Sequence, residues 1–154
     1  MDISIGPTGE ELPAGRGTPK EGAQVFVQQG CVGCHGEGGV GGLAPALRSK
    51  KAQNVPIRER ERILPLRAPF ATTVWDFIHR GMPLGREGTL TPDEVYALTA
   101  YLLFLNKVIR RTQSWTKRVC RRSRCRLAMT TPGCLTGSPG RQGFRGIPTS
   151  TTAS

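Results

Sequence analysis

Two cysteines and a histidine stand together in the segment CVGCHGEGG, residues 31–39: they are Cys31, Cys34 and His35. Two thiols three positions apart, with an imidazole directly behind the second, can do three kinds of chemistry. They can attach a haem through thioether bonds while the imidazole ligates its iron, they can bind zinc, or they can form a redox-active disulfide. The rest of the sequence has to distinguish between these three possibilities.

The surrounding sequence favours the haem. A structural zinc site needs about four ligands, and before residue 110 the only other histidine or cysteine is the distant His79. A thioredoxin-like site lies at a strand-to-helix turn of a βαβ unit, whereas no strand pattern precedes Cys31. We therefore expect one covalently attached haem c, with zinc binding and thiol–disulfide chemistry as the alternatives.

The second axial position decides between an electron carrier and a haem enzyme or sensor with an open site. Met82 is the main candidate for this ligand, because it follows the helix-stopping Gly81 and precedes Pro83 in a predicted loop. A thioether ligand stabilises ferrous iron and raises the reduction potential, as a carrier requires. A methionine can also simply fill a gap in a core, and His79 is the lesser candidate.

Three predicted helices position these residues. Thr18 and Glu21 form a capping box around Pro19, which begins a short helix running into Cys31. Apolar spacing predicts a second helix over residues 70–80. A second capping box at Thr91 to Glu94 begins an amphipathic helix that extends to about residue 107. Residues 36–69 are expected to be mostly loop with room for one short helix, so the fold class is all-α.

The positive charge of the chain is concentrated at its C-terminal end. Residues 1–109 contain 12 Lys and Arg and 11 Asp and Glu, whereas residues 110–154 contain 10 Lys and Arg and no acidic residue. This end shows no convincing apolar period. We therefore expect a globular unit followed by a disordered basic tail over residues 110–154.

Several segments resemble a known family. The segments CVGCHG, GGLAPAL and GMPLG, together with the closing helix LTPDEVYALTAYLLFLN, resemble the class I c-type cytochromes. More narrowly, DISIGPTGEELPAG, PFATTVWDFIHRGMP and LTPDEVYALTAYLLFLNKVI are similar to the haem subunits of bacterial sulfite or sulfane dehydrogenases of the Sox thiosulfate-oxidation system. The resemblance covers residues 2–109. It divides the chain into an N-terminal arm over 1–17, a cytochrome c domain over 18–109 and the tail.

The resemblance implies a small all-α bundle around the haem and a role for each site residue. Cys31 and Cys34 would carry the thioether bonds, His35 would be the proximal ligand and Met82 the distal one. The carbonyl of Pro45 would steady the imidazole, and Trp75 and Tyr101 would line or back the haem pocket, where ordinary core packing explains them equally well.

Two segments depart from the family pattern. Residues 48–67 lack the aromatic residues that usually precede the PFATT segment. Where the tail begins, relatives continue with an acidic segment, and synonymous codon choices in a shifted reading frame permit such an ending from residue 110 onward. We hypothesise a frameshift near codon 110, which the composition favours over a DNA-binding arm.

The expected function is the transfer of single electrons. The sequence contains no Ser/His/Asp constellation, phosphate-binding loop or molybdenum-cofactor domain, so we expect an electron-transfer protein or a non-catalytic oxidoreductase subunit. Its partners would be a molybdenum sulfite or sulfane dehydrogenase subunit and a downstream cytochrome or oxidase, without nucleic acid. No apolar run is long enough to span a membrane. Haem c implies the periplasm, and since no secretory signal is present we expect the chain to be truncated at its N-terminus.

Overall fold

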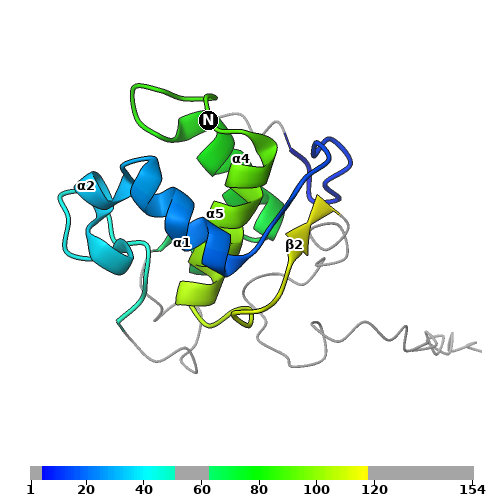
Figure 1. The fold of residues 1–154 in the computed structure, drawn as a ribbon. Helices are drawn as coiled ribbons and strands as arrows, with labels where there is room; N and C mark the ends of the chain where they lie inside the picture. Colours follow the sequence, from blue (N-terminus) through cyan, green and yellow to red (C-terminus); the bar gives the residue numbers. More distant parts are fainter. Residues whose placement is uncertain (1–4, 51–62, 118–154) are drawn as a thin grey trace, which may run out of the picture.

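The computed structural model describes residues 5–50 and 63–117, and these residues form a helical bundle (Figure 1). In chain order, the elements are β1 (Arg16–Gly17), α1 (Pro19–Gln28), α2 (Cys31–His35), the 3-10 turn η1 (Glu37–Gly39), α3 (Leu64–Arg67), α4 (Ala71–Gly81), α5 (Pro92–Leu105) and β2 (Trp115–Thr116). The predicted all-α class is confirmed.

The two capping boxes begin α1 and α5 as the sequence predicts. At α1 the Glu21 N–H donates to the Thr18 hydroxyl at 3.3 Å, and the Thr18 N–H donates to the Glu21 carboxylate at 2.7 Å. At α5 the Glu94 N–H donates to the Thr91 hydroxyl at 3.4 Å, and the Thr91 N–H donates to the Glu94 carboxylate at 2.8 Å. Each box satisfies two backbone N–H groups that a helix start otherwise leaves unpaired.

Helices α1 and α5 cross in close contact because a glycine lies at the crossing point. A Cβ added to Gly22 would collide with the backbone carbonyl of Ala97 and with the Tyr101 side chain. One turn further along α1, the ring of Phe26 packs against Tyr101 with 5.5 Å between centroids. The crossing fixes the orientation of α1 and therefore the position of Cys31, which lies just beyond its C-terminal end.

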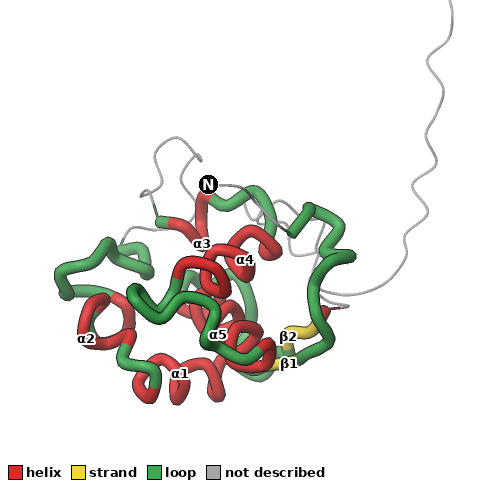
Figure 2. Tube along the Cα trace, turned by 90° about the horizontal axis from the view of Figure 1, so that it is seen from above, coloured by secondary structure: helices red, strands yellow, loops and turns green. Residues whose placement is uncertain are grey.

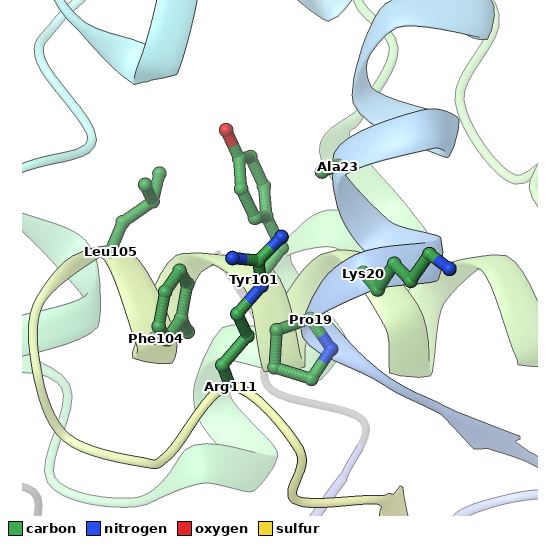
Figure 3. A pocket seen from close by; sticks show the side chains of 7 residues that line it. All are labelled: Pro19, Lys20, Ala23, Tyr101, Phe104, Leu105 and Arg111. Atoms are coloured by element: carbon green, nitrogen blue, oxygen red, sulfur yellow. The ribbon is translucent and has the colours of Figure 1, made fainter.

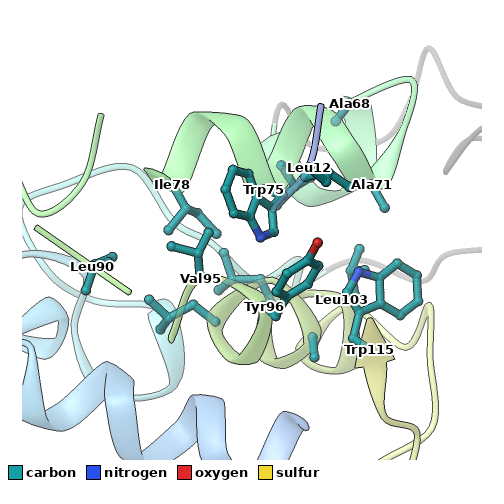
Figure 4. Packing of buried hydrophobic residues seen from close by; sticks show 14 of the residues in the cluster. Leu12, Ala68, Ala71, Trp75, Ile78, Leu90, Val95, Tyr96, Leu103 and Trp115 are labelled. Atoms are coloured by element: carbon teal, nitrogen blue, oxygen red, sulfur yellow. The ribbon is translucent and has the colours of Figure 1, made fainter. Parts of the chain in front are cut away.

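The core lies between α4 and α5 and is closed by residues from both ends of the described chain (Figure 4). Trp75 of α4 packs against Tyr96 of α5 with ring centroids 5.6 Å apart. Leu12, before β1, and Trp115 in β2 are both 1% exposed and belong to the same cluster. The Tyr96 hydroxyl donates to the Pro13 carbonyl at 2.9 Å, which holds the N-terminal arm on α5.

Residues 110–117 differ from the expectation that the basic tail has no apolar face to pack. Strand β2 pairs antiparallel with β1, with Gly17 opposite Trp115, and the Trp115 indole is buried. The ammonium group of Lys117 also donates to the Glu10 carbonyl at 3.0 Å. The packed part of the chain therefore extends past the predicted boundary at residue 109, and the remainder of the tail, residues 118–154, lies outside the described residues.

Two smaller findings complete the fold. Most of residues 48–67 lies outside the described ranges, and the short helix for which the sequence left room is α3. In the two described ranges, no helix is both long and apolar enough to cross a membrane.

Candidate functional site

Cys31, Cys34 and His35 share a single short helix, α2. Gly30 in the left-handed region (φ 77°) turns the chain out of α1 and starts α2, and Gly36 (φ 77°) ends it. Both positions favour glycine because other residues rarely adopt a positive φ. Cys31 is half-buried against the core, whereas Cys34 is exposed.

A glycine-rich loop folds back from α2 and fixes the histidine. The Ala44 N–H donates to the Cys34 carbonyl at 2.8 Å, and a Cβ added at Gly42 would collide with that same carbonyl. The next residue places its carbonyl at the imidazole, with 3.0 Å between His35 Nδ1 and Pro45 O. Since a carbonyl oxygen only accepts, this hydrogen bond requires the proton on Nδ1, and Nε2 keeps its lone pair for a metal.

Asn106 anchors this loop to the end of α5, and the sequence reasoning missed it. The side chain is fully buried and donates to the carbonyls of Leu47 and Leu102 at 2.8 and 2.9 Å. Its side-chain oxygen also accepts from the Ser49 N–H at 3.0 Å. Asn106 thus holds the loop two residues beyond Pro45. The available signal was an amide residue directly after an apolar helix, where it can satisfy the last carbonyls.

Met82 lies where α4 ends, at the start of a loop on the side of the molecule that carries α2 (Figures 1 and 2). Its N–H caps α4 by donating to the Ile78 carbonyl at 3.0 Å, and its side chain is partly buried against the core cluster. We call residues 82–90 the Met82 loop. The guanidinium of Arg86 in this loop donates to the Gln29 carbonyl, just before α2, at 3.1 Å.

His79, the lesser ligand candidate, is held by a stacking contact. Its ring lies on Trp75 at 4.9 Å between centroids and 20° between planes. Trp75 is itself 1% exposed in the core, and Tyr101 packs on Phe26 at the helix crossing. Core packing thus explains the positions of Trp75 and Tyr101, the two residues expected to line or back the haem pocket.

The Cys31 thiol lies in surroundings that keep it protonated. Burial raises the pKa of Cys31, the Cys34 thiol adds to this increase, and a backbone hydrogen bond and the Arg86 charge only partly oppose it. A redox-active cysteine needs the opposite, a pKa lowered toward neutrality so that the thiolate is present. The surroundings of Cys31 therefore disfavour the thiol–disulfide alternative. Among the described residues, no group of three or more His, Cys, Asp and Glu side chains could hold a metal ion.

A separate groove lies beside the crossing of α1 and α5 (Figure 3). It has a volume of about 340 Å³, and none of the predicted haem-binding residues Cys31, Cys34, His35, Pro45 and Met82 lines it. The walls come from α1, α5 and the segment after α5: Pro19, Lys20, Ala23, Tyr101, Phe104, Leu105 and Arg111. Tyr101 faces this groove, and burial raises its pKa.

The donor set fits a covalent haem. One helical turn presents two thiols and an imidazole whose Nε2 is available, and a second segment presents a thioether that is partly buried among apolar side chains. Thiols can form thioether bonds to the porphyrin, and His and Met are the axial ligands of electron-transferring cytochromes. The fold and this donor set define a small helical haem protein of the electron-transfer class.

Comparison with known proteins agrees with this class. The family model for cytochrome c matches residues 19–106, so the chain belongs to the cytochrome c family. Its cofactor is a covalently bound haem c, and its function is electron transfer. A search of curated proteins gave no match.

Among solved structures, the chain resembles the sulfane dehydrogenase SoxCD from Paracoccus pantotrophus. The TM-score is 0.67 at 22% sequence identity, and the match covers 99% of this chain and 79% of the other. At this level of identity, the likeness concerns the fold.

Proposed function

We propose that Cys31 and Cys34 bind the haem through thioether bonds, that His35 and Met82 are the axial ligands of its iron, and that Pro45 orients His35. The observation that carries this assignment is the 3.0 Å contact between His35 Nδ1 and the Pro45 carbonyl. This contact supports the assignment because it orients the ring and leaves Nε2 available for the iron, the arrangement that metal-ligating histidines share. Bound haem c supplies a centre that takes up and releases one electron at a time.

The protein around this centre favours a carrier. Met82 follows a helix end and packs among apolar residues, so a thioether is available on a second element to fill the sixth position. A filled sixth position excludes small molecules from the iron, which separates carriers from haem enzymes and gas sensors.

We further propose that the electrons come from a sulfite or sulfane dehydrogenase, and that this chain is its electron-accepting subunit or partner. Two observations support this proposal: the segments PFATTVWDFIHRGMP and LTPDEVYALTAYLLFLNKVI resemble such haem subunits, and the fold is similar to that of a sulfane dehydrogenase. The electrons would pass on to a downstream cytochrome or oxidase, and the site of action would be the periplasm.

Haem attachment tests the first proposal. The chain, produced with an export leader in a host that attaches haem c, should carry haem through denaturing electrophoresis with peroxidase staining. The double variant Cys31→Ala, Cys34→Ala should lose this signal, whereas Cys120→Ala, in the tail, should keep it. A protein that holds zinc and no covalent haem would overturn the assignment.

Reduction by a purified molybdenum sulfite or sulfane dehydrogenase tests the partner. With its sulfur substrate present, the enzyme should reduce the ferric protein in a stopped-flow mixture much faster than free substrate does. If an unrelated dehydrogenase reduces the protein equally fast, the partner proposal fails while the haem assignment stands.

A further inference from the structure

We propose that Arg86 is a positioning residue that pins the Met82 loop against the end of α1, and that it thereby keeps the Met82 sulfur in place at the haem. The inference rests on the proposed ligation by Met82. It adds a residue that lies outside the haem motif at Cys31 to His35.

The contact joins two segments that are far apart in sequence. Arg86 Nη2 donates to the backbone carbonyl of Gln29 at 3.1 Å, and Gln29 is the C-cap residue of α1, two residues before Cys31. Carbonyls at a helix C-terminus have partial negative charge, which a guanidinium complements. Arg86 therefore ties the loop that carries Met82 to the segment that carries the two cysteines.

Gln29 is itself fixed by a third element. Its side-chain amide donates to the Glu94 carboxylate at 2.7 Å, and Glu94 belongs to the capping box that begins α5. The acceptor of the Arg86 hydrogen bond is thus part of the rigid crossing of α1 and α5. A side chain that donates to this carbonyl is therefore held at a fixed position relative to α1 and α5.

The middle of the Met82 loop has little apolar packing of its own, so this contact matters there. Residues 84–89 are exposed, and Leu84 is 83% exposed. Within the loop, the Arg86 N–H donates to the Pro83 carbonyl at 2.9 Å, and the Thr89 hydroxyl donates to the Arg86 carbonyl at 2.7 Å. These bonds shape the turn, and the Gly88 N–H ties it to α4 by donating to the His79 carbonyl at 3.1 Å. Among the described residues, the Arg86 guanidinium is the group that attaches the tip of the loop to α1. The exposed residues 84–89 lie between the partly buried Met82 and the buried Leu90, and a segment without buried contacts opens at a low free-energy cost.

The consequence concerns the sulfur. Each opening of the loop gives Met82 freedom to leave the iron and gives an external ligand access to the sixth position. A hydrogen bond from a charged donor strengthens closure, and solvent exposure weakens the effect. We expect removal of the guanidinium to raise the population of the open loop by about fivefold.

The experiment compares Arg86→Gln with the matched control Arg110→Gln in the haem-loaded protein. Arg110 is also an exposed arginine, but it follows α5. Hydrogen exchange is measured at the amides of residues 84–89, and the rate at which added imidazole binds the ferric iron is measured by absorbance. In Arg86→Gln both should rise about fivefold, and in Arg110→Gln neither should change.

Two outcomes would overturn the proposal. Unchanged exchange in Arg86→Gln would show that the guanidinium does not pin the loop. Faster exchange with an unchanged imidazole rate would show that the loop does not hold the ligand. Met82→Ala tests the assumption that Met82 is the axial ligand. If this variant binds imidazole at the same rate as the parent protein, Met82 is not the ligand and the ligand assignment fails. The hydrogen-exchange data still report separately whether Arg86 pins the loop.

Discussion

His35 and Met82 are held in place by different means. His35 has a hydrogen bond from its own ring to Pro45, and the loop that contains Pro45 is anchored by the buried amide of Asn106. Met82 is attached through the cap of α4 and through Arg86. The histidine side is supported by the buried side chain of Asn106, whereas the methionine side relies on an exposed loop. We therefore expect the methionine to be the ligand that is lost first under perturbation.

Met82→Ala should convert the carrier into an open-site haem protein. Loss of the thioether frees the sixth position, lowers the reduction potential and lets carbon monoxide bind the ferrous form. His79→Ala should leave ligation and potential unchanged, because the His79 ring is stacked on Trp75. Potentiometry and ferrous spectra with carbon monoxide give both readouts. Rapid carbon monoxide binding by the unsubstituted protein, with no further change in Met82→Ala, would instead indicate a haem enzyme or sensor.

At the scale of elements, the start of α5 links a helix cap to the site. Burial raises the pKa of the Glu94 carboxyl, but hydrogen bonds from the Thr91 N–H, the Thr91 hydroxyl and the Gln29 amide lower it, and the pKa lies below its ordinary value of 4.5. The same carboxylate thus caps α5 and holds the residue that accepts the Arg86 hydrogen bond.

Glu94→Gln should change how the protein responds to acid. A carboxyl whose pKa is lower in the folded than in the unfolded state contributes stability above the unfolded value, and this contribution is lost as the pH falls through the folded value. The parent protein should therefore exceed Glu94→Gln in free energy of unfolding at about pH 7, and the difference should shrink as the pH falls below the pKa of the unfolded state. Denaturant titrations at a series of pH values measure it. A difference that stays constant over this range would contradict the linkage.

The elements that sequence reasoning predicted are those specified by neighbouring residues. Thr18 and Thr91 begin helices through partners three residues away, and Cys31 to His35 form their site within a single turn. The contacts that it missed join distant segments without a repeating pattern. Arg86 meets Gln29 and Asn106 meets Leu47 across nearly sixty residues. A side chain that bonds to a backbone carbonyl leaves no signature at the partner's position, since every residue has such a carbonyl.

At the scale of the whole molecule, α5 is the element on which both ends of the described chain are packed. The N-terminal arm lies on it through Leu12 and through the bond between Tyr96 and Pro13. The segment after α5 returns to pair β2 with β1. The site is therefore supported by a closed structure whose two ends stabilise each other, and the packed unit is larger than the match to the cytochrome c family over residues 19–106.

Trp115 offers a test of this closure. Its side chain is 1% exposed in the core cluster, and its Nε1 has no hydrogen-bond partner among the described residues. Trp115→Ala should lower the free energy of unfolding by about 3–5 kcal/mol, because it removes a large buried ring. Trp115→Phe should lower it by about 1 kcal/mol at most, since it keeps most of the packing and removes a buried N–H that has no partner. Haem content should be the same in both variants, as Trp115 lies outside the attachment motif.

Denaturant unfolding of the haem-loaded protein distinguishes the two substitutions. If Trp115→Ala shifts the free energy of unfolding by less than about 0.5 kcal/mol, as surface substitutions do, the segment after α5 is not part of the folded unit and the packed domain ends near residue 109.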